Sequence, residues 1–121
     1  MKPETIEEIL ITGLDDWIHL ADVAWLVRSG EGCRTKDEIV SLSLGVIRYL
    51  LEAHLIEIGD VTGAGFVSWD LPIDASVERV REAWQRLDRD PMPGEICWLA
   101  TTSNGDHMAQ EALRRRGLSP S

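Results

Sequence analysis

The sequence is poor in cysteine and has no long apolar segment. Two of its 121 residues are cysteines, Cys33 and Cys97, and a disulfide framework in so small a domain would need more of them, so we expect two free thiols. The apolar stretches are short and interrupted by polar or charged residues, so none approaches the roughly 20 apolar residues of a membrane span. Residues 1–5 (MKPET) already include an acidic residue and lack the apolar region of a signal peptide. We therefore expect a cytoplasmic protein that does not contact a membrane.

Basic residues are also scarce, 12 against 21 acidic ones, which gives a formal net charge of −9 at pH 7. The imbalance is concentrated in one half of the chain, because residues 1–60 hold 12 acidic and 5 basic side chains, a net −7. Nucleic acid is a polyanion, and proteins that bind it usually carry a basic patch. Such a charge opposes nucleic acid at long range, although a local basic patch could overcome it. Nucleic acid is therefore a disfavoured partner.

Motifs for metal binding and nucleophilic catalysis are missing as well. The histidines are few and far apart: His19, His54 and His107. Their spacing matches no zinc motif, and the glycines of residues 59–65 lack the Gly-Lys-Ser/Thr ending of a phosphate-binding loop. Cys97 lies in an apolar run and is expected in the core rather than as a nucleophile. Spacing leaves open a convergence in space of His19, Asp22 and Cys33. We predict a non-enzymatic protein with no cofactor and no metal.

Apolar residues make up 44% and charged residues 27% of the sequence, which is typical of a globular domain and not of a disordered chain. Length and pattern predict a single α+β domain over residues 1–121. Helices are expected over residues 4–12, 35–54, 74–87 and 103–116. Strands are expected over residues 55–58, 66–69 and 95–101, the first two as a hairpin with a long tip. The helix over 74–87 should turn an apolar line inward, made by Val77, Val80, Trp84 and Leu87.

The segment between Gly13 and Gly32 allows two interpretations. Gly13 is expected to end the first helix, and residues 29–32 are expected to break the chain again. Between them, either a short strand over 17–20 precedes a helix over 21–29, or residues 17–28 form one helix. Periodicity does not decide between the two.

The longest predicted helix begins at a capping box, in which Thr35 is followed three residues later by Glu38. It is apolar on most sides, so we expect it to be largely buried. One thin polar or small stripe should face outward, made by Glu38, Ser41, Gly45, Arg48 and Glu52. Gly45 costs about 1 kcal/mol relative to Ala in mid-helix, so we expect a close neighbour at that point.

The order of these elements resembles a winged helix-turn-helix domain. The resemblance is carried by residues 18–24 (IHLADVA), 43–58 (SLGVIRYLLEAHLIEI) and 98–105 (WLATTSNG). It implies a three-helix core and a small antiparallel β-hairpin wing over residues 1–69, an inserted helix and loop over 70–94, and a C-terminal strand and helix over 95–121. The chain is also similar to small actinobacterial proteins of unknown function that carry the WDLP stretch of residues 69–72, a likeness that implies no activity.

In DNA-binding winged helices, the third helix enters the major groove and basic residues hold the phosphates. The candidates here are Arg34, Lys36, Ser41 and Arg48. The outward stripe sums to −1, however, and residues 59–66 contain no Lys or Arg. A site with several phosphate contacts needs more cations. We therefore predict an adaptor or dimeric interaction module that acts by protein–protein contact. The alternative is a sequence-specific DNA-binding transcriptional regulator.

Tryptophan is the one aromatic residue in good supply, with five against one Tyr and one Phe. Most of the five are expected in the core or where the inserted helix packs. Trp is over-represented at binding hot spots, so Trp25 on a helix face and Trp69 beside the Pro72 turn are the candidate interface residues. The partner is another protein or a second copy of the chain, since a homodimer would use the same patch twice.

Overall fold

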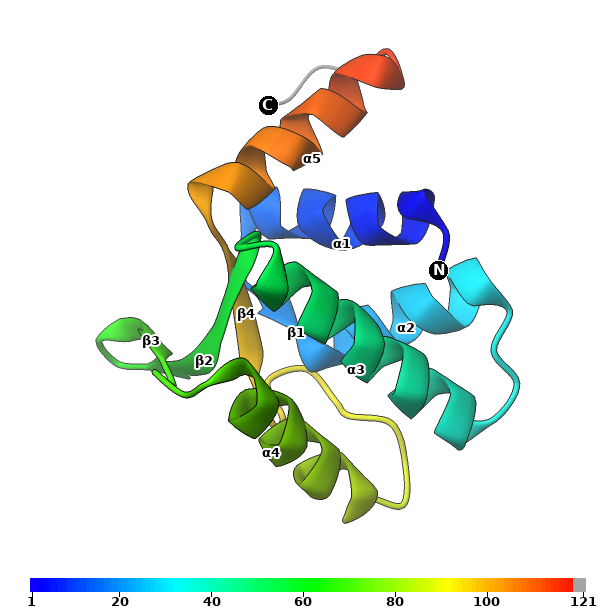
Figure 1. Ribbon diagram of the computed structural model, residues 1–121, viewed down its shortest axis with the longest axis vertical. Helices are drawn as coiled ribbons and strands as arrows, with labels where there is room; N and C mark the ends of the chain where they lie inside the picture. Colours follow the sequence, from blue (N-terminus) through cyan, green and yellow to red (C-terminus); the bar gives the residue numbers. More distant parts are fainter. Residues whose placement is uncertain (119–121) are drawn as a thin grey trace.

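A computed structural model describes residues 1–118 of the chain, and it confirms the α+β class (Figure 1). Its helices are α1 (Pro3–Asp15), α2 (Leu20–Glu31), α3 (Lys36–Glu52), α4 (Ile73–Gln85) and α5 (Ser103–Arg115). Its strands are β1 (Ile18–His19), β2 (Ile56–Thr62), β3 (Gly65–Ser68) and β4 (Trp98–Thr101). Among the described helices, none combines the length and apolarity that a bilayer-spanning segment requires.

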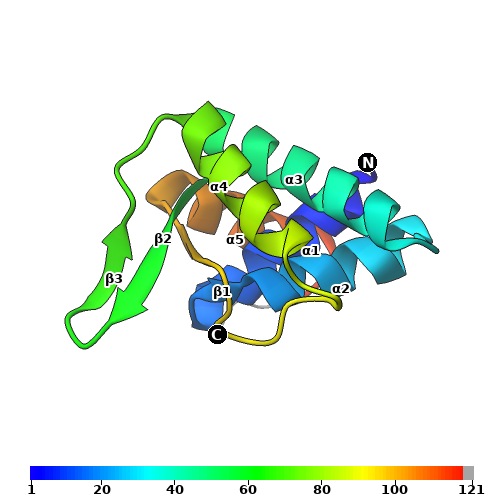
Figure 2. The ribbon, with the colours of Figure 1, turned by 90° about the horizontal axis from the view of Figure 1, so that it is seen from below.

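The strands form one antiparallel sheet in the order β1-β4-β2-β3. The last strand in sequence therefore lies second in the sheet, where Leu99 is opposite Ile18 on one side and Ile58 on the other. The β2–β3 hairpin extends away from the helices, as Figure 2 shows from below. Its tip is short rather than long, because β2 runs on to Thr62 and pairs with Gly65.

Gly13, which was expected to end the first helix, and Gly30, which belongs to the expected break over residues 29–32, both lie inside helices. The break itself is confirmed at Gly32, the left-handed C-cap of α2 (φ 67°). α1 continues through Gly13 to Asp15, and α2 continues through Gly30 to Glu31. A Cβ at Gly13 would lie 2.5 Å from Cγ2 of Thr101, and a Cβ at Gly30 would lie 2.5 Å from Oγ1 of Thr5. Both glycines are therefore close-packing positions between elements, which one-dimensional turn signals cannot distinguish from helix ends. Of the two interpretations of residues 17–31, the strand followed by a helix is the right one.

α3 begins as the capping box predicts, with the backbone N–H of Glu38 donating to Oγ1 of Thr35 at 3.2 Å. The expected neighbour of Gly45 is absent, because a Cβ at this residue would meet no atom within 4 Å. Mid-helix Gly45 therefore carries its propensity cost without a packing reason. α3 ends at Glu52, and the chain turns through His54 in a left-handed conformation (φ 57°).

The C-terminal elements differ from expectation mainly at their ends. α4 begins after Pro72, close to the expected start at residue 74, and Val77, Val80 and Trp84 are buried as predicted. Leu87, the fourth residue of the expected inward line, lies beyond Gln85, where the helix ends. β4 begins at Trp98, since Ile96 has φ 70° and leaves extended geometry.

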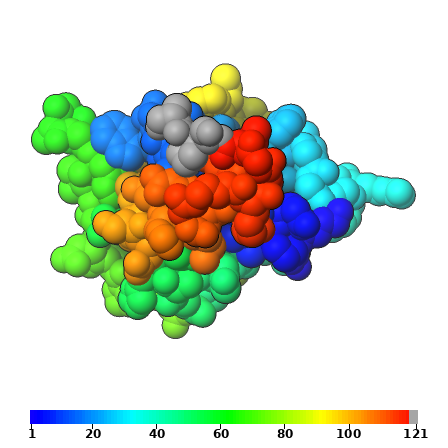
Figure 3. Space-filling view, turned by 90° about the horizontal axis from the view of Figure 1, so that it is seen from above, coloured from blue at the N-terminus to red at the C-terminus, as the bar shows by residue number. Residues whose placement is uncertain are grey.

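α5 packs across α1 (Figures 1 and 3). Arg115 and Arg116 form ion pairs with Glu7, and Arg116 also pairs with Glu8. The hydrogen bond from Arg115 is the main cause that lowers the pKa of Glu7. The arginines at the end of α5 therefore join two helices rather than form a free basic tail.

The turn after α3 is tied to the turn before α5. The Leu55 carbonyl accepts a hydrogen bond from the Thr102 N–H at 3.0 Å, and Oγ1 of Thr102 donates to the His54 carbonyl at 2.7 Å. Thr102 also caps α5, accepting from the Gly105 N–H at 3.1 Å. Gly105 lies so near this junction that a Cβ would overlap the Leu55 carbonyl oxygen.

The loop between α4 and β4 is organised by one carboxylate. Glu95 accepts two hydrogen bonds from the Arg89 guanidinium, at 2.6 and 3.1 Å, and one from the Met92 N–H at 2.7 Å. The Arg89 hydrogen bonds, followed by the Met92 bond, lower the pKa of Glu95 from 4.5 to about 2.

Replacing Gly105 or Gly45 by Ala should have opposite effects on stability. Gly105→Ala places a methyl group against the Leu55 carbonyl and should cost about 1–3 kcal/mol through overpacking. Gly45→Ala enters open space and should stabilise the helix by about 0.5–1 kcal/mol. Urea unfolding followed by circular dichroism measures both, and equal effects of the two substitutions would contradict the assigned contacts.

Acidification should weaken the loop that Glu95 organises. Because the pKa of Glu95 is lower in the folded chain, its contribution is complete above about pH 4.5 and is lost as the pH falls toward 2. A carboxyl-carbon NMR titration should place the midpoint of Glu95 near 2, and Arg89→Ala should return it toward 4.5. A Glu95 midpoint that Arg89→Ala leaves unchanged would show that the pair does not form.

Candidate functional site

The residues proposed for DNA contact lie at the start and along the outer side of α3. Arg34 is exposed in the turn before the helix, Ser41 is exposed on it, and Lys36 and Arg48 are half-buried. The predicted outward stripe is confirmed, because its other members, Glu38, Gly45 and Glu52, are exposed as well. The outer side of α3 therefore does collect the candidate residues.

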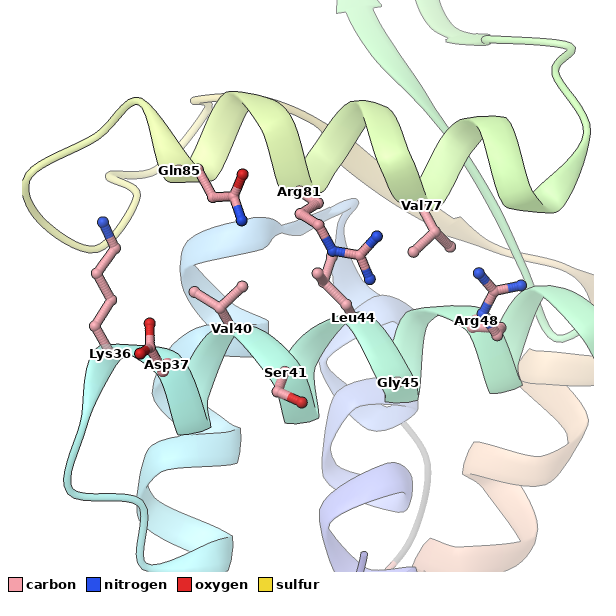
Figure 4. A pocket seen from close by; sticks show the side chains of 10 residues that line it. All are labelled: Lys36, Asp37, Val40, Ser41, Leu44, Gly45, Arg48, Val77, Arg81 and Gln85. Atoms are coloured by element: carbon pink, nitrogen blue, oxygen red, sulfur yellow. The ribbon is translucent and has the colours of Figure 1, made fainter.

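α4 packs along α3 on this same side, and a groove of about 500 Å³ lies between the two helices (Figure 4). Its apolar lining comes from Val40, Leu44 and Val77. Its charged and polar lining comes from Lys36, Asp37, Ser41, Arg48, Arg81 and Gln85. Gly45 is the remaining lining residue on the α3 side. Because it has no side chain, only its backbone lines the groove at this position.

The cations of the groove all have partners within the chain. Lys36 donates to the Leu87 carbonyl in the loop just after α4, and Arg48 forms an ion pair with Asp74 in the first turn of α4. Arg81 pairs with Glu78, one turn earlier on α4. The hydrogen bond to Asp74 is the main cause that raises the pKa of Arg48. Two of the four proposed DNA contacts thus link α3 to the segment that carries α4.

Trp69, one of the two candidate interface residues, is half-buried. The guanidinium carbon of Arg79 lies 3.9 Å above its ring centroid, in cation–π geometry. Arg79 also approaches Asp60 of the hairpin at 3.9 Å. One face of the Trp69 ring is therefore already used to hold the hairpin strands against α4.

Trp25, the other candidate, projects from α2 with 64% of its surface exposed. Beside it, between the first turns of α1 and the end of α2, lies a hollow of about 610 Å³. The hollow is lined by Lys2, Glu4, Thr5, Glu8, Trp25, Leu26, Ser29 and Gly30. An exposed indole next to a concave surface is the arrangement found at binding hot spots.

The wall of this hollow is held in place by a small hydrogen-bond cluster. Thr5 is buried, and its hydroxyl donates to Glu31 at 2.7 Å, while the Lys2 N–H donates to the same carboxylate oxygen at 3.0 Å. These two bonds, with that from Thr5 the larger cause, lower the pKa of Glu31. Because Gly30 lets α1 approach α2 at Thr5, the hollow is already formed in the unbound chain.

The residues that could carry out catalysis are engaged in structure. The backbone N–H of His19 donates to Asp22 at 3.1 Å at the start of α2, and the His19 ring packs on Trp98 at 4.2 Å between centroids, with its Nδ1 buried and without a hydrogen-bond partner. Cys33 Sγ donates to the Val27 carbonyl at 3.8 Å. Burial raises the pKa of Cys97 to about 12, which keeps this thiol protonated. Among residues 1–118, no three His, Cys, Asp or Glu side chains form a group that could hold a metal ion.

Sequence reasoning identified Trp25 but missed both concave surfaces. The hollow beside Trp25 depends on the close contact at Gly30, which looked like a chain break. The groove needs Arg81 and Gln85 of α4, and nothing in their spacing shows that α4 packs on α3. The inward line of α4 was the available signal, since it required an apolar partner helix.

Comparison of the chain with models of known protein families, with curated proteins and with solved structures yields no significant match.

Proposed function

We propose that this chain is a non-enzymatic winged-helix protein that acts by contact with another protein, as an adaptor or a dimeric interaction module. The winged-helix part of the proposal is supported by three helices, α1 to α3, beside a sheet in which β4 lies between β1 and β2. In that arrangement, residues 70–94 are an insertion before the last strand of the wing.

Trp25 carries the proposal of protein contact. Burying the side chain of Trp25 in an interface would be favourable by about 25 cal/mol per Å² of apolar surface removed from water. Its 64% exposure is the highest fraction among the exposed large hydrophobic side chains of the described chain. The preformed hollow next to it gives a partner side chain a place to enter.

The charges around the hollow indicate the chemistry of the partner. Glu4 and Glu8 of α1 line it together with Lys2, and Glu8 also pairs with Arg116, on a chain whose net charge is −9. A matching partner presents an apolar side chain flanked by basic residues, because complementary charge speeds association and excludes acidic competitors.

A photo-crosslinker at position 25 tests this function. With p-benzoyl-phenylalanine in place of Trp25, illumination of cells of the source organism should give a discrete cross-linked product. The same group at Met108, which is 36% exposed on α5, is the matched control and should give none. Mass spectrometry then distinguishes a second copy of the chain from another protein. The absence of a discrete product from position 25 would contradict the proposal.

Trp25→Ala should weaken the complex strongly without unfolding the chain. Truncating an exposed side chain changes the free energy of unfolding by no more than about 0.5 kcal/mol, whereas loss of a hot spot weakens binding by about 2 kcal/mol or more. Thermal unfolding and binding of the identified partner measure the two effects separately.

The second candidate function is sequence-specific DNA binding through Arg34, Lys36, Ser41 and Arg48. The observation that favours it is the gathering of Lys36, Arg48 and Arg81 along one side of α3. Against it, α4 occupies that side, and a recognition helix needs free access to a groove about 12 Å wide.

Fluorescence anisotropy with random duplex DNA at low salt separates the two functions. We expect no binding at micromolar protein, because residues 1–60 carry a net −7 and non-specific binding depends on cations. Salt-dependent binding that Arg48→Glu abolishes would instead establish the DNA-binding function.

A further inference from the structure

We propose that the open edge of β3 pairs antiparallel with the β3 edge of a second copy of this chain, with Val67 opposite the partner's Val67 on the two-fold axis. β3 is the last strand in the sheet order β1-β4-β2-β3, and no strand of residues 1–118 lies beyond it. This edge shares no residue with the hollow beside Trp25. The pairing is therefore independent of the proposed protein contact at Trp25.

The contacts inside the hairpin show which backbone groups of β3 face outward. The Trp69 N–H donates to the Ile58 carbonyl of β2 at 3.0 Å. The Val67 carbonyl also faces β2, so closely that it would overlap a Cβ at Gly59. Along an antiparallel strand, residues that bond to a given neighbour alternate with residues that do not. The odd-numbered residues of β3 therefore bond to β2, and the even-numbered ones turn their N–H and C=O groups to the open edge.

The outward groups of β3 are complementary to themselves. They belong to Phe66 and Ser68, which lie on either side of Val67. In an antiparallel pair centred on Val67, Phe66 of each copy is opposite Ser68 of the other, and each such pair exchanges two N–H···O bonds. This register therefore satisfies every outward N–H and C=O group of the strand.

The same register brings apolar side chains together on both faces of the joined sheet. Val67 is 48% exposed, and the two Val67 residues form a pair without hydrogen bonds, the kind in which Cα atoms are closest, about 4.5 Å apart. Cross-strand contact between β-branched side chains stabilises such a pair. On the other face, the two Phe66 side chains lie on the diagonal of the pair, at about 7–8 Å, which aromatic rings can span.

The edge of β3 lacks the features that usually prevent such pairing. Natural edge strands are protected by charged side chains, by proline or by a covering element. Residues 61–69 (VTGAGFVSW) contain neither a charge nor a proline. The hairpin extends away from the helices (Figure 2), and both Val67 and Ser68 are exposed. The outer edge is therefore accessible to a second chain.

The net charge of −9 does not prevent the pairing, because no charged side chain lies on the paired strand. Asp60 of β2 is opposite Val67 in the hairpin and has Arg79 at 3.9 Å. Three strand spacings of about 4.8 Å each would separate it from the partner's Asp60, which is more than the Debye length of about 8 Å at physiological salt. Asp70 lies beyond β3, in a left-handed turn (φ 54°).

Sedimentation velocity of the full chain, from micromolar to millimolar concentration, tests the pairing. Because the ladder is short, we expect a weak dimer that forms as the concentration rises. No larger species should follow, since a two-fold pair uses the edge on both chains. Over the same range, amide hydrogen exchange measured by NMR should slow at Phe66 and Ser68, whose N–H groups become bonded only in the dimer.

Two substitutions of Ser68 separate the role of its backbone from that of its side chain. Ser68→Pro removes the outward N–H without removing a bond to β2, a position at which edge strands tolerate proline, and it should abolish the dimer. Ser68→Ala keeps the N–H and is the matched control, which should leave the dimer intact. Circular dichroism confirms that both variants are folded.

Opposite charges at position 67 test the register. Val67→Lys and Val67→Glu each place like charges directly opposite one another, which destabilises a strand pair, so each variant alone should be monomeric. An equimolar mixture of the two should associate again, because unlike charges then face each other. Trp25→Ala, on the other surface, should leave the dimer unchanged.

Four outcomes would overturn the pairing. A monomer at millimolar concentration is the first, and it is the result expected if the edge takes only an extended segment of another protein. The second is a dimer that Ser68→Pro leaves intact, and the third is a mixture of the Val67 variants that stays monomeric. The fourth is loss of the dimer in Trp25→Ala, which would assign it to the surface of the proposed function instead.

Discussion

The junction between the turn after α3 and the turn before α5 is the constraint on which the rest of the structure depends. Thr102 bonds the carbonyls of both His54 and Leu55, and Gly105 permits this approach because a Cβ would overlap the Leu55 oxygen. The junction joins segments 48 residues apart and places β4 beside β2. Once β4 lies there, it also pairs with β1, and α5 continues from it onto α1.

The same junction determines what residues 70–94 can do. Because β2 and β4 are neighbours, the segment between them must leave the sheet and return, and α4 uses that path to bury Val77, Val80 and Trp84. α4 then packs on α3, which puts arginines from both helices around one groove. The groove between α3 and α4 and the obstruction of α3 toward DNA are thus two consequences of one insertion. The surface around Trp25, formed by α1 and α2, is unaffected by it.

Prediction from the sequence succeeded where a pattern is local. The capping box at Thr35 and the outward stripe of α3 depend on residues within a few turns of one helix, and both are confirmed. The inward line of α4 is confirmed at Val77, Val80 and Trp84, whereas Leu87 lies beyond the end of the helix. It failed where the role of a residue depends on packing against a residue far away in the sequence. Gly13 looked like a helix end because glycine is a common terminator, and Gly30 lay in an expected break that occurs two residues later, at Gly32. Each of the two makes room for a threonine from another element. Gly45 was expected to make such room and faces open space.

The sequence by itself determined the α+β class, the segments that become helices and the acidic character, because these follow from periodicity, caps and composition. It also singled out Trp25 as a candidate, since Trp is over-represented at binding hot spots. Only the tertiary structure decided which glycines pack, that Arg79 covers Trp69, and that Lys36, Arg48 and Arg81 share a groove. Those outcomes depend on contacts between residues far apart in the chain, and such contacts form only when β4 pairs between β1 and β2.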